Sequence, residues 1–354
     1  MIPIFKPYMP KNVMPELEAL LYSGKLAYGC YGKAFESSLS DYIGNSYVLT
    51  VSSYNQAMLM AITILDLKVG DEVIASPVSC LASNQPFITK GIKVVWADVE
   101  PETGALSVDD VKTKITSKTK AIFHNHFCGY IGHIAEINQL AKEYGVWVVD
   151  DAIEAFGSES EGKKIGNVGT DLTVFSFQTV RLPNTIDGAA ITFNNPVLYE
   201  KAIKIRDYGI DRSNFRLKNG EINPEHDITL EGYGATMNEV SSLIGLQQMP
   251  DINRLIHLQR NNAQAWQSRL VQQPGIKPLL PIADTLPNFW VYGVLCDNKN
   301  EAINAFRDSG WYATGVHINN NLYSVFGKQP ALKGVNLFME KFLALPCGWW
   351  VNQE

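Results

Sequence analysis

Residues 120–152 read KAIFHNHFCGYIGHIAEINQLAKEYGVWVVDDA, and this stretch decides the fold class. It opens and closes with nearly continuous apolar runs, 120–127 and 146–152, as in parallel strands that are buried on both faces. Between them, residues 134–145 carry apolar side chains at helical spacing. A strand, a helix and a second strand in this order predict a βαβ unit and a parallel sheet.

The same alternation extends in both directions along the chain. Further strands are predicted in short apolar runs at 46–53, 71–76, 92–99, 172–177 and 188–193. Helices are predicted at 55–66, 107–115 and 195–209. The sequence therefore predicts an α/β fold with a mainly parallel seven-stranded sheet that is flanked by helices.

The regular alternation of predicted strands and helices ends near residue 194. Residues 212–232 are polar and without periodicity, whereas 238–273 show helical periodicity over many turns, as expected for a helix that bridges two domains. A strand at 289–296 and a helix at 301–310 predict a smaller α+β domain. We place the division at residue 240. Residues 1–240 form the large α/β domain with its N-terminal segment, and 241–354 form the bridging helix and the small C-terminal domain.

The composition excludes several function classes. Of the 354 residues, 46% are hydrophobic and 19% charged, which is typical of a globular protein. A net charge of -6 disfavours nucleic acid or an anionic membrane as a partner. The N-terminus lacks the apolar core of a signal peptide, and no apolar run reaches the ~18 residues of a membrane span. Five scattered cysteines indicate reduced thiols in a cytoplasmic protein.

Motifs along nearly the whole chain carry a resemblance to a known family. They include LYSGKLAYGCYGKAFESSLSDYIG at 21–44, KVGDEVIASPVSCLASNQPF at 68–87, VWVVDDAIEAFGSES at 146–160, RDYGIDR at 206–212 and ALPCGWW at 344–350. In this order they resemble the DegT/DnrJ/EryC1/StrS sugar aminotransferases, which are fold-type I enzymes that depend on pyridoxal phosphate. The resemblance implies a homodimer with active sites built from both chains.

The resemblance assigns three positions around the cofactor ring. Asp151 ends a predicted strand, at the sheet edge where ligands bind, and matches the aspartate that pairs with the protonated ring nitrogen. The alternative is a cap of the next helix. Glu154 stands where the family has Gln or His near the phenolic oxygen, or it is an acid favoured by a helix N-terminus. Cys80 stands where the family often has a residue that stacks on the ring.

Other positions match the phosphate end of the cofactor. Ser176 matches a family serine whose hydroxyl contacts the phosphate. Ser53, Asn55 and Gln56 lie between a strand and a helix, where backbone N–H groups bind phosphate, and Asn55 can cap that helix. The family has Ser-Gly-Thr or Ser-Cys-Thr here, so we expect the bulky Tyr54 of this chain to crowd the pocket.

Arg181 is the main departure from the family pattern. The segment FSFQTVRLPNTIDGAA, 175–190, keeps the family spacing but has Arg181 at the position of the Schiff-base lysine. Lysine can lose a proton and attack an aldehyde, whereas a guanidinium stays protonated. Two interpretations stay open: Arg181 holds a phosphate, sulfate or carboxylate, or it pairs with Asp151 or Glu154 and fills the vacant pocket.

Several neighbouring positions have changed as well. Ala189, Gly234 and Thr236 replace the Gly, Asn and Arg that the family commonly has. Several changes together suggest weakened or lost cofactor binding. His317 and Asn319 lie in a polar loop, in a region that frames the sugar-nucleotide site in the family; a solvated loop is the alternative.

Three residues of types that bind metals lie close together in the sequence. His124, His126 and Cys128 alternate along a predicted strand, so their side chains are expected to share one face. The family keeps a histidine at the position of His126 without a metal, and no second ligand cluster is visible. We therefore predict no metal.

Two hypotheses follow. In the first, the chain is a family enzyme acting on a keto- or amino-sugar, expected to be nucleotide-linked, in cell-surface polysaccharide or amino-sugar biosynthesis. It would bind pyridoxal or pyridoxamine phosphate noncovalently and would not carry out classical aldimine transamination. In the second, it is a non-catalytic homologue without cofactor that keeps the fold and dimer and binds a ligand or a partner protein.

Overall fold

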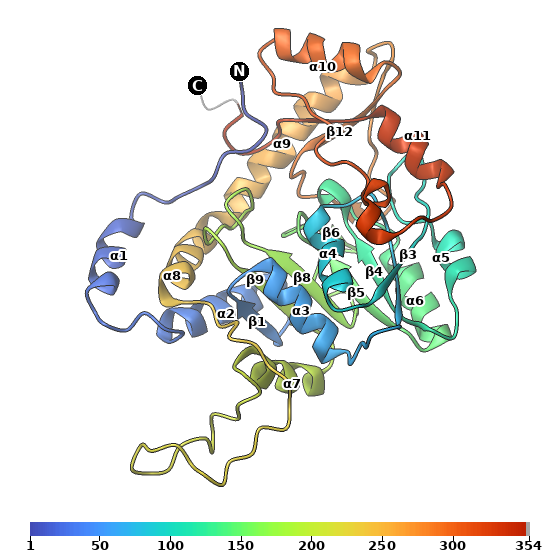
Figure 1. The fold of residues 1–354 in the computed structure, drawn as a ribbon. Helices are drawn as coiled ribbons and strands as arrows, with labels where there is room; N and C mark the ends of the chain where they lie inside the picture. The colour runs from blue at the N-terminus through green and yellow to red at the C-terminus, as the bar shows by residue number, and fades with distance from the viewer. Residues whose placement is uncertain (352–354) are drawn as a thin grey trace.

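A seven-stranded sheet lies at the centre of the computed structural model, which describes residues 1–351 (Figure 1). Its strands, in the order in which they lie side by side, are β1 (Val48–Val51), β9 (Ala189–Phe193), β8 (Leu172–Ser176), β5 (Trp147–Asp151), β4 (Thr119–Asn125), β2 (Glu72–Ala75) and β3 (Lys93–Trp96). From β8 to β3 all neighbours are parallel, and only β9 runs antiparallel to its two neighbours. The predicted mainly parallel sheet is confirmed.

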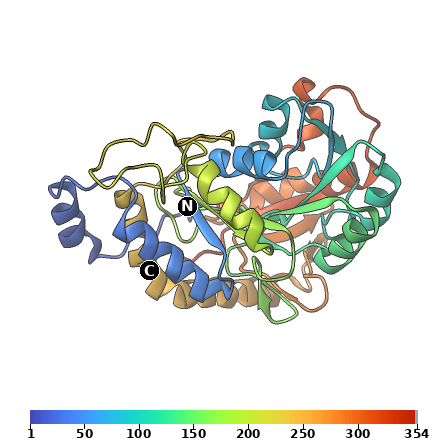
Figure 2. The same cartoon turned by 90° about the horizontal axis from the view of Figure 1, so that it is seen from below.

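Helices cover both faces of this sheet (Figure 2). The helices of the described residues are α1 (Val13–Leu21), α2 (Cys30–Ile43), α3 (Tyr54–Ile64), α4 (Leu81–Thr89), α5 (Val108–Lys114), α6 (Ile134–Tyr144), α7 (Pro196–Arg206), α8 (Glu239–Gln248), α9 (Ile252–Leu270), α10 (Lys299–Asp308) and α11 (Lys333–Lys341). Short 3₁₀ turns are η1 (Phe127–Gly129), η2 (Met249–Asp251), η3 (Asn320–Leu322) and η4 (Ser324–Phe326). The polar segment 212–232 forms turns and loops that extend away from α7 (Figure 1).

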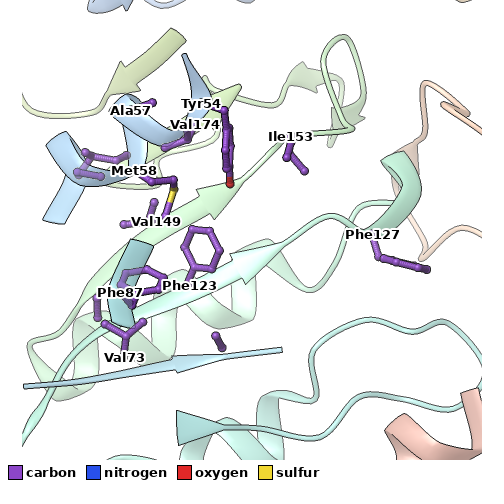
Figure 3. Packing of buried hydrophobic residues seen from close by; sticks show 14 of the residues in the cluster. Tyr54, Ala57, Met58, Val73, Phe87, Phe123, Phe127, Val149, Ile153 and Val174 are labelled. Atoms are coloured by element: carbon purple, nitrogen blue, oxygen red, sulfur yellow. The ribbon is translucent and has the colours of Figure 1, made fainter. Parts of the chain in front are cut away.

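Successive side chains of the central strands face opposite sides of the sheet. Val149 packs in a core cluster with Met58 of α3 (Figure 3), whereas Val148 belongs to a second cluster with α5 and α6. The alternation continues to the end of β5, because neighbouring strand residues point to opposite faces. Asp151 therefore faces α3, and Asp150 faces the other side, toward His124.

The predicted helix at 238–273 is wrong as a single element. The structure has two helices, α8 and α9, separated by the turn η2. Pro250 lies in that turn, and proline lacks the backbone N–H that a continuous helix needs. Helix α9 runs from the seven-stranded sheet toward α10 (Figure 1), and its role as a bridge between two domains stays a prediction.

Two small sheets complete the fold. One consists of β10 (Ile276–Pro278), β12 (Tyr292–Cys296) and β13 (Phe342–Leu345), and the other of β11 (Thr285–Leu286), β6 (Glu159–Ser160) and β7 (Lys163–Lys164). The chain begins beside the C-terminal region, where Ile2 bridges to Trp311. The division at residue 240 into two domains stays a prediction. Within residues 1–351, no helix combines the length and apolarity of a membrane span.

Glu239 joins α8 to the start of α2. Its carboxylate accepts hydrogen bonds from the backbone N–H groups of Gly29, Tyr31 and Gly32 at 2.8–3.0 Å. The first N–H groups of a helix have no partner within the helix, and a negative charge there is favourable. This contact fixes α2 against α8.

We predict that Glu239→Ala lowers the free energy of unfolding by about 2 kcal/mol, because three N–H groups lose a charged acceptor. Denaturant titration followed by circular dichroism measures the loss. Glu239→Gln keeps one acceptor oxygen and should lose less. Equal stability of Glu239→Ala and the unmodified protein would contradict the capping role.

Candidate functional site

Asp151 ends β5 at the carboxyl edge of the sheet and has no exposed surface. The hydroxyl of Tyr54 donates to its Oδ1 at 2.7 Å, and the backbone N–H of Ile153 donates to the same oxygen at 3.2 Å. Its Oδ2 has no partner within the described residues. Burial raises the pKa of Asp151 to about 6, although the hydroxyl groups of Ser83 and Tyr54 act in the opposite direction.

Glu154 lies one turn further along and is also buried. Its Oε1 lies 3.4 Å from Arg181 Nη1 and 3.1 Å from His317 Nε2. Its Oε2 accepts a hydrogen bond from the backbone N–H of Cys128 at 2.6 Å. Burial alone would raise the pKa of Glu154, but the hydrogen bond from His317 and the charge of Arg181 outweigh it and lower the pKa. Glu154 is therefore a buried anion with three donors.

Arg181 is enclosed by groups that neutralise or cover its charge. Besides Glu154, its guanidinium lies over the ring of Trp290, 4.2 Å from the ring centre, a cation–π contact. Trp290 is held in turn by Phe5, stacked at 4.4 Å, and by the carbonyl of Val180. Of the two interpretations of Arg181, the geometry supports the ion pair, and the partner is Glu154 rather than Asp151.

The predicted phosphate end is occupied by internal contacts. Ser53 is the N-cap of α3 and accepts from the N–H of Gln56, so the predicted capping by Asn55 is wrong. Asn55 is instead exposed, because the helix begins one residue before it. Ser176 ends β8 as predicted, and its hydroxyl accepts weakly from the N–H of Gln178 at 3.4 Å.

The cavity at this place is small. It is lined by Ser176, Glu154, Arg181 and Trp290 among others and has a volume of about 10 Å³, room for one water molecule. Small-molecule pockets typically measure about 300–1,000 Å³. None of the described residues that line this cavity is a lysine. A cavity of this size does not hold pyridoxal phosphate, and of the residues predicted to bind the cofactor only Glu154 and Ser176 line it, together with Arg181.

The remaining predicted residues surround this cluster. Cys80 precedes α4, and burial raises the pKa of its thiol; the nearby charges of Glu154 and Arg181 have smaller effects. His317 reaches inward to Glu154, whereas the amide of Asn319 bonds to Asn321 within its own loop. The loop is thus partly closed onto the site rather than wholly solvated.

The three groups proposed to share a strand face do not do so. β4 ends at Asn125, and Cys128 lies in the turn η1 with a φ of 57°. His124 and His126 instead gather around Asp150, at 3.0 and 3.7 Å from its Oδ1, in a buried group that could hold a metal by its ligand types. Burial lowers the pKa of His126 to about 3, so it is neutral. The absence of a metal stays a prediction.

Gly234 is explained by its surroundings. A Cβ at this position would lie 2.2 Å from the hydroxyl oxygen of Tyr208, so a side chain such as Asn would require the exposed ring of Tyr208 to move. Thr236 lines a separate surface cleft with Arg206 and Arg212. Sequence reasoning missed Trp290 and the Tyr54–Asp151 contact; only the bulk of Tyr54 gave a signal.

Comparisons with known proteins place these features in a family context. The profile described as "DegT/DnrJ/EryC1/StrS aminotransferase family" matches residues 7–353. The chain is 30% identical over 248 residues to the uncharacterised protein MJ1066 of Methanocaldococcus jannaschii, covering 70% of this chain and 64% of that protein. It is 27% identical over 302 residues to GDP-perosamine synthase of Vibrio cholerae, covering 85% and 79%. The crystal structure of sugar aminotransferase CalS13 from Micromonospora echinospora superposes with a TM-score of 0.93, at 25% identity, covering 100% of this chain and 96% of that chain.

The raised pKa of Asp151 predicts a specific pH dependence. The folded protein keeps this proton up to about pH 6, whereas the ordinary value is 3.8, so the folded state binds more protons between these values. The free energy of unfolding should therefore fall by about 2–3 kcal/mol as the pH rises from the ordinary value toward 6, because ionisation of the buried carboxyl group is unfavourable. In Asp151→Asn this loss should be absent in denaturant titrations at pH 4 to 7.

The same substitution at Asp297, whose side chain is 78% exposed, is the control. Glu154, with its lowered pKa, acts in the opposite direction and only as pH falls below its ordinary value of 4.5. An unchanged pH profile for Asp151→Asn would show that Asp151 is ionised normally.

The ion pair of Glu154 and Arg181 predicts strong coupling. Glu154→Gln leaves a buried guanidinium without its counter-charge and should lower the free energy of unfolding by about 3 kcal/mol. The double variant Glu154→Gln, Arg181→Met removes both charges and should recover most of this loss. Purely additive losses in denaturant titrations would rule out the pairing.

Proposed function

The chain belongs to the DegT/DnrJ/EryC1/StrS aminotransferase family, and from this premise we propose that it is a non-catalytic member that acts by binding. The proposal rests on Arg181, which we take to stand at the position of the Schiff-base lysine. A guanidinium cannot form that bond, and here it is held by Glu154 and Trp290 beside a cavity of only about 10 Å³.

In this proposal the ligand is a keto- or amino-sugar, linked to a nucleotide, and the pathway is amino-sugar or cell-surface polysaccharide biosynthesis. The similarity to GDP-perosamine synthase supports the sugar class, since that relative is named for a nucleotide-linked amino sugar. A partner protein, such as an active member of the family, is the other ligand that a non-catalytic homologue can take.

We further propose a homodimer in the cytoplasm. Exposed apolar side chains on the segment 212–232, namely Leu217, Ile222 and Ile228, support an interface there, because such groups favour burial. The five cysteines are free, which supports a reducing compartment.

A second candidate function is a lysine-independent enzyme that binds pyridoxamine phosphate noncovalently. One observation favours it: Asp151 Oδ2 is buried without a partner among the described residues and could accept a hydrogen bond from a ring nitrogen. Binding of the cofactor would require Tyr54 and Arg181 to move. Calorimetry with pyridoxamine phosphate distinguishes the two candidates, because only the enzyme should bind it.

We predict that the purified protein mixed with pyridoxal phosphate shows no absorbance band of a lysine-bound aldimine near ~420 nm, because position 181 offers no amine. Borohydride reduction followed by peptide mass spectrometry should find no cofactor on any site lysine. Stoichiometric trapping on one lysine would overturn the proposed function.

A further inference from the structure

Tyr54 connects two places that the family resemblance assigns to opposite ends of the cofactor. It is the first residue of α3, directly after Ser53, at the predicted phosphate end. Its hydroxyl ends on Asp151, the predicted partner of the ring nitrogen. Figure 3 shows the ring directed from the start of α3 toward the sheet, with the hydroxyl at its far end. The side chain is buried, at 6% exposure.

We infer that Tyr54 is a built-in replacement for the cofactor ring. Its phenol ring fills the space between α3 and Asp151, and its hydroxyl donates to Oδ1 of the carboxylate that the resemblance assigns to the ring nitrogen. This goes beyond the proposed function, because it names the group that closes the site; it rests on the assignment of Ser53 and Asp151 to the two cofactor ends.

Steric exclusion follows from packing. Protein interiors are close-packed, so two aromatic rings cannot share one volume. Tyr54 belongs to the core cluster with Met58 and Val149, which leaves it little freedom to turn away (Figure 3). A cofactor ring that reached Asp151 would have to displace Tyr54 from this cluster.

The hydrogen bond from Tyr54 also provides a donor to the buried carboxylate of Asp151. Asp151 has no contact with water, and a buried acid without donors is costly. The hydroxyl of Tyr54 adds a side-chain donor to the backbone donor of Ile153. The family pattern of Gly or Cys at position 54 offers no phenolic hydroxyl, so Tyr54 adds a donor to Asp151 besides the nearby hydroxyl of Ser83.

Arg181 and Tyr54 then act on different parts of the site. Arg181 offers no amine for a Schiff base, and its guanidinium contacts Glu154 and Trp290. Tyr54 occupies the ring position beside Asp151. Restoration of lysine alone should therefore not restore the cofactor. Both positions must change.

The experiment compares the unmodified protein with Tyr54→Gly, Arg181→Lys and the double variant. Calorimetry with pyridoxamine phosphate measures access to the ring position, and we expect Tyr54→Gly to bind at least about tenfold more tightly than the unmodified protein. With pyridoxal phosphate, the double variant should give the band near ~420 nm and borohydride trapping at position 181, whereas Arg181→Lys alone should give neither.

Two further variants keep the test decisive. Tyr54→Cys introduces the other small residue of the family pattern and replaces Tyr54→Gly if that variant does not fold. Tyr54→Phe keeps the ring and loses the hydroxyl, so it should still exclude pyridoxamine phosphate while it unfolds at a lower temperature.

The inference is overturned if Arg181→Lys alone forms the aldimine as fully as the double variant, or if neither small residue at position 54 admits pyridoxamine phosphate. Each result would leave the proposed function standing, because the unmodified protein would still lack the amine. Trapping of pyridoxal phosphate by the unmodified protein would instead overturn the proposed function.

Discussion

Two buried carboxylates at the carboxyl end of one strand must have partners, and the arrangement of the site follows from that need. Asp151 and Glu154 are both withdrawn from water, where an unpaired charge costs several kcal/mol. Asp151 obtains the hydroxyl of Tyr54, and Glu154 obtains Arg181 and His317. The groups that meet these two demands come from α3, from the loop after β8 and from the C-terminal region.

These contacts also connect distant parts of the chain. His317 and Trp290 belong to the C-terminal region, yet one touches Glu154 and the other covers Arg181. Asn288 adds a hydrogen bond from its amide to the carbonyl of Glu154 at 2.8 Å. These contacts hold Glu154 and Arg181 in place, whereas Asp151 Oδ2 and Arg181 Nε have no hydrogen-bond partner among the described residues.

The sequence predicted the sheet because strands depend on local pattern, and the same pattern led us to expect the site at the carboxyl edge of the sheet. Apolar runs identified the strands, and the end of the strand at 146–152 located Asp151. The sequence could not predict which side chains pair across the fold. Whether Arg181 pairs with Glu154 or with Asp151 depends on the directions of their side chains. No spacing rule brings Trp290 to this place, and only the family resemblance put His317 near the site. The break at Pro250 did have a local signal, since proline interrupts helices.

The most direct test is a crystal structure of the unmodified protein grown with saturating pyridoxamine phosphate. The account predicts the Tyr54 hydroxyl at hydrogen-bond distance from Asp151, Arg181 against Glu154 and Trp290, and no ring between α3 and Asp151. A cofactor ring with its nitrogen on Asp151, and Tyr54 turned away, would contradict it.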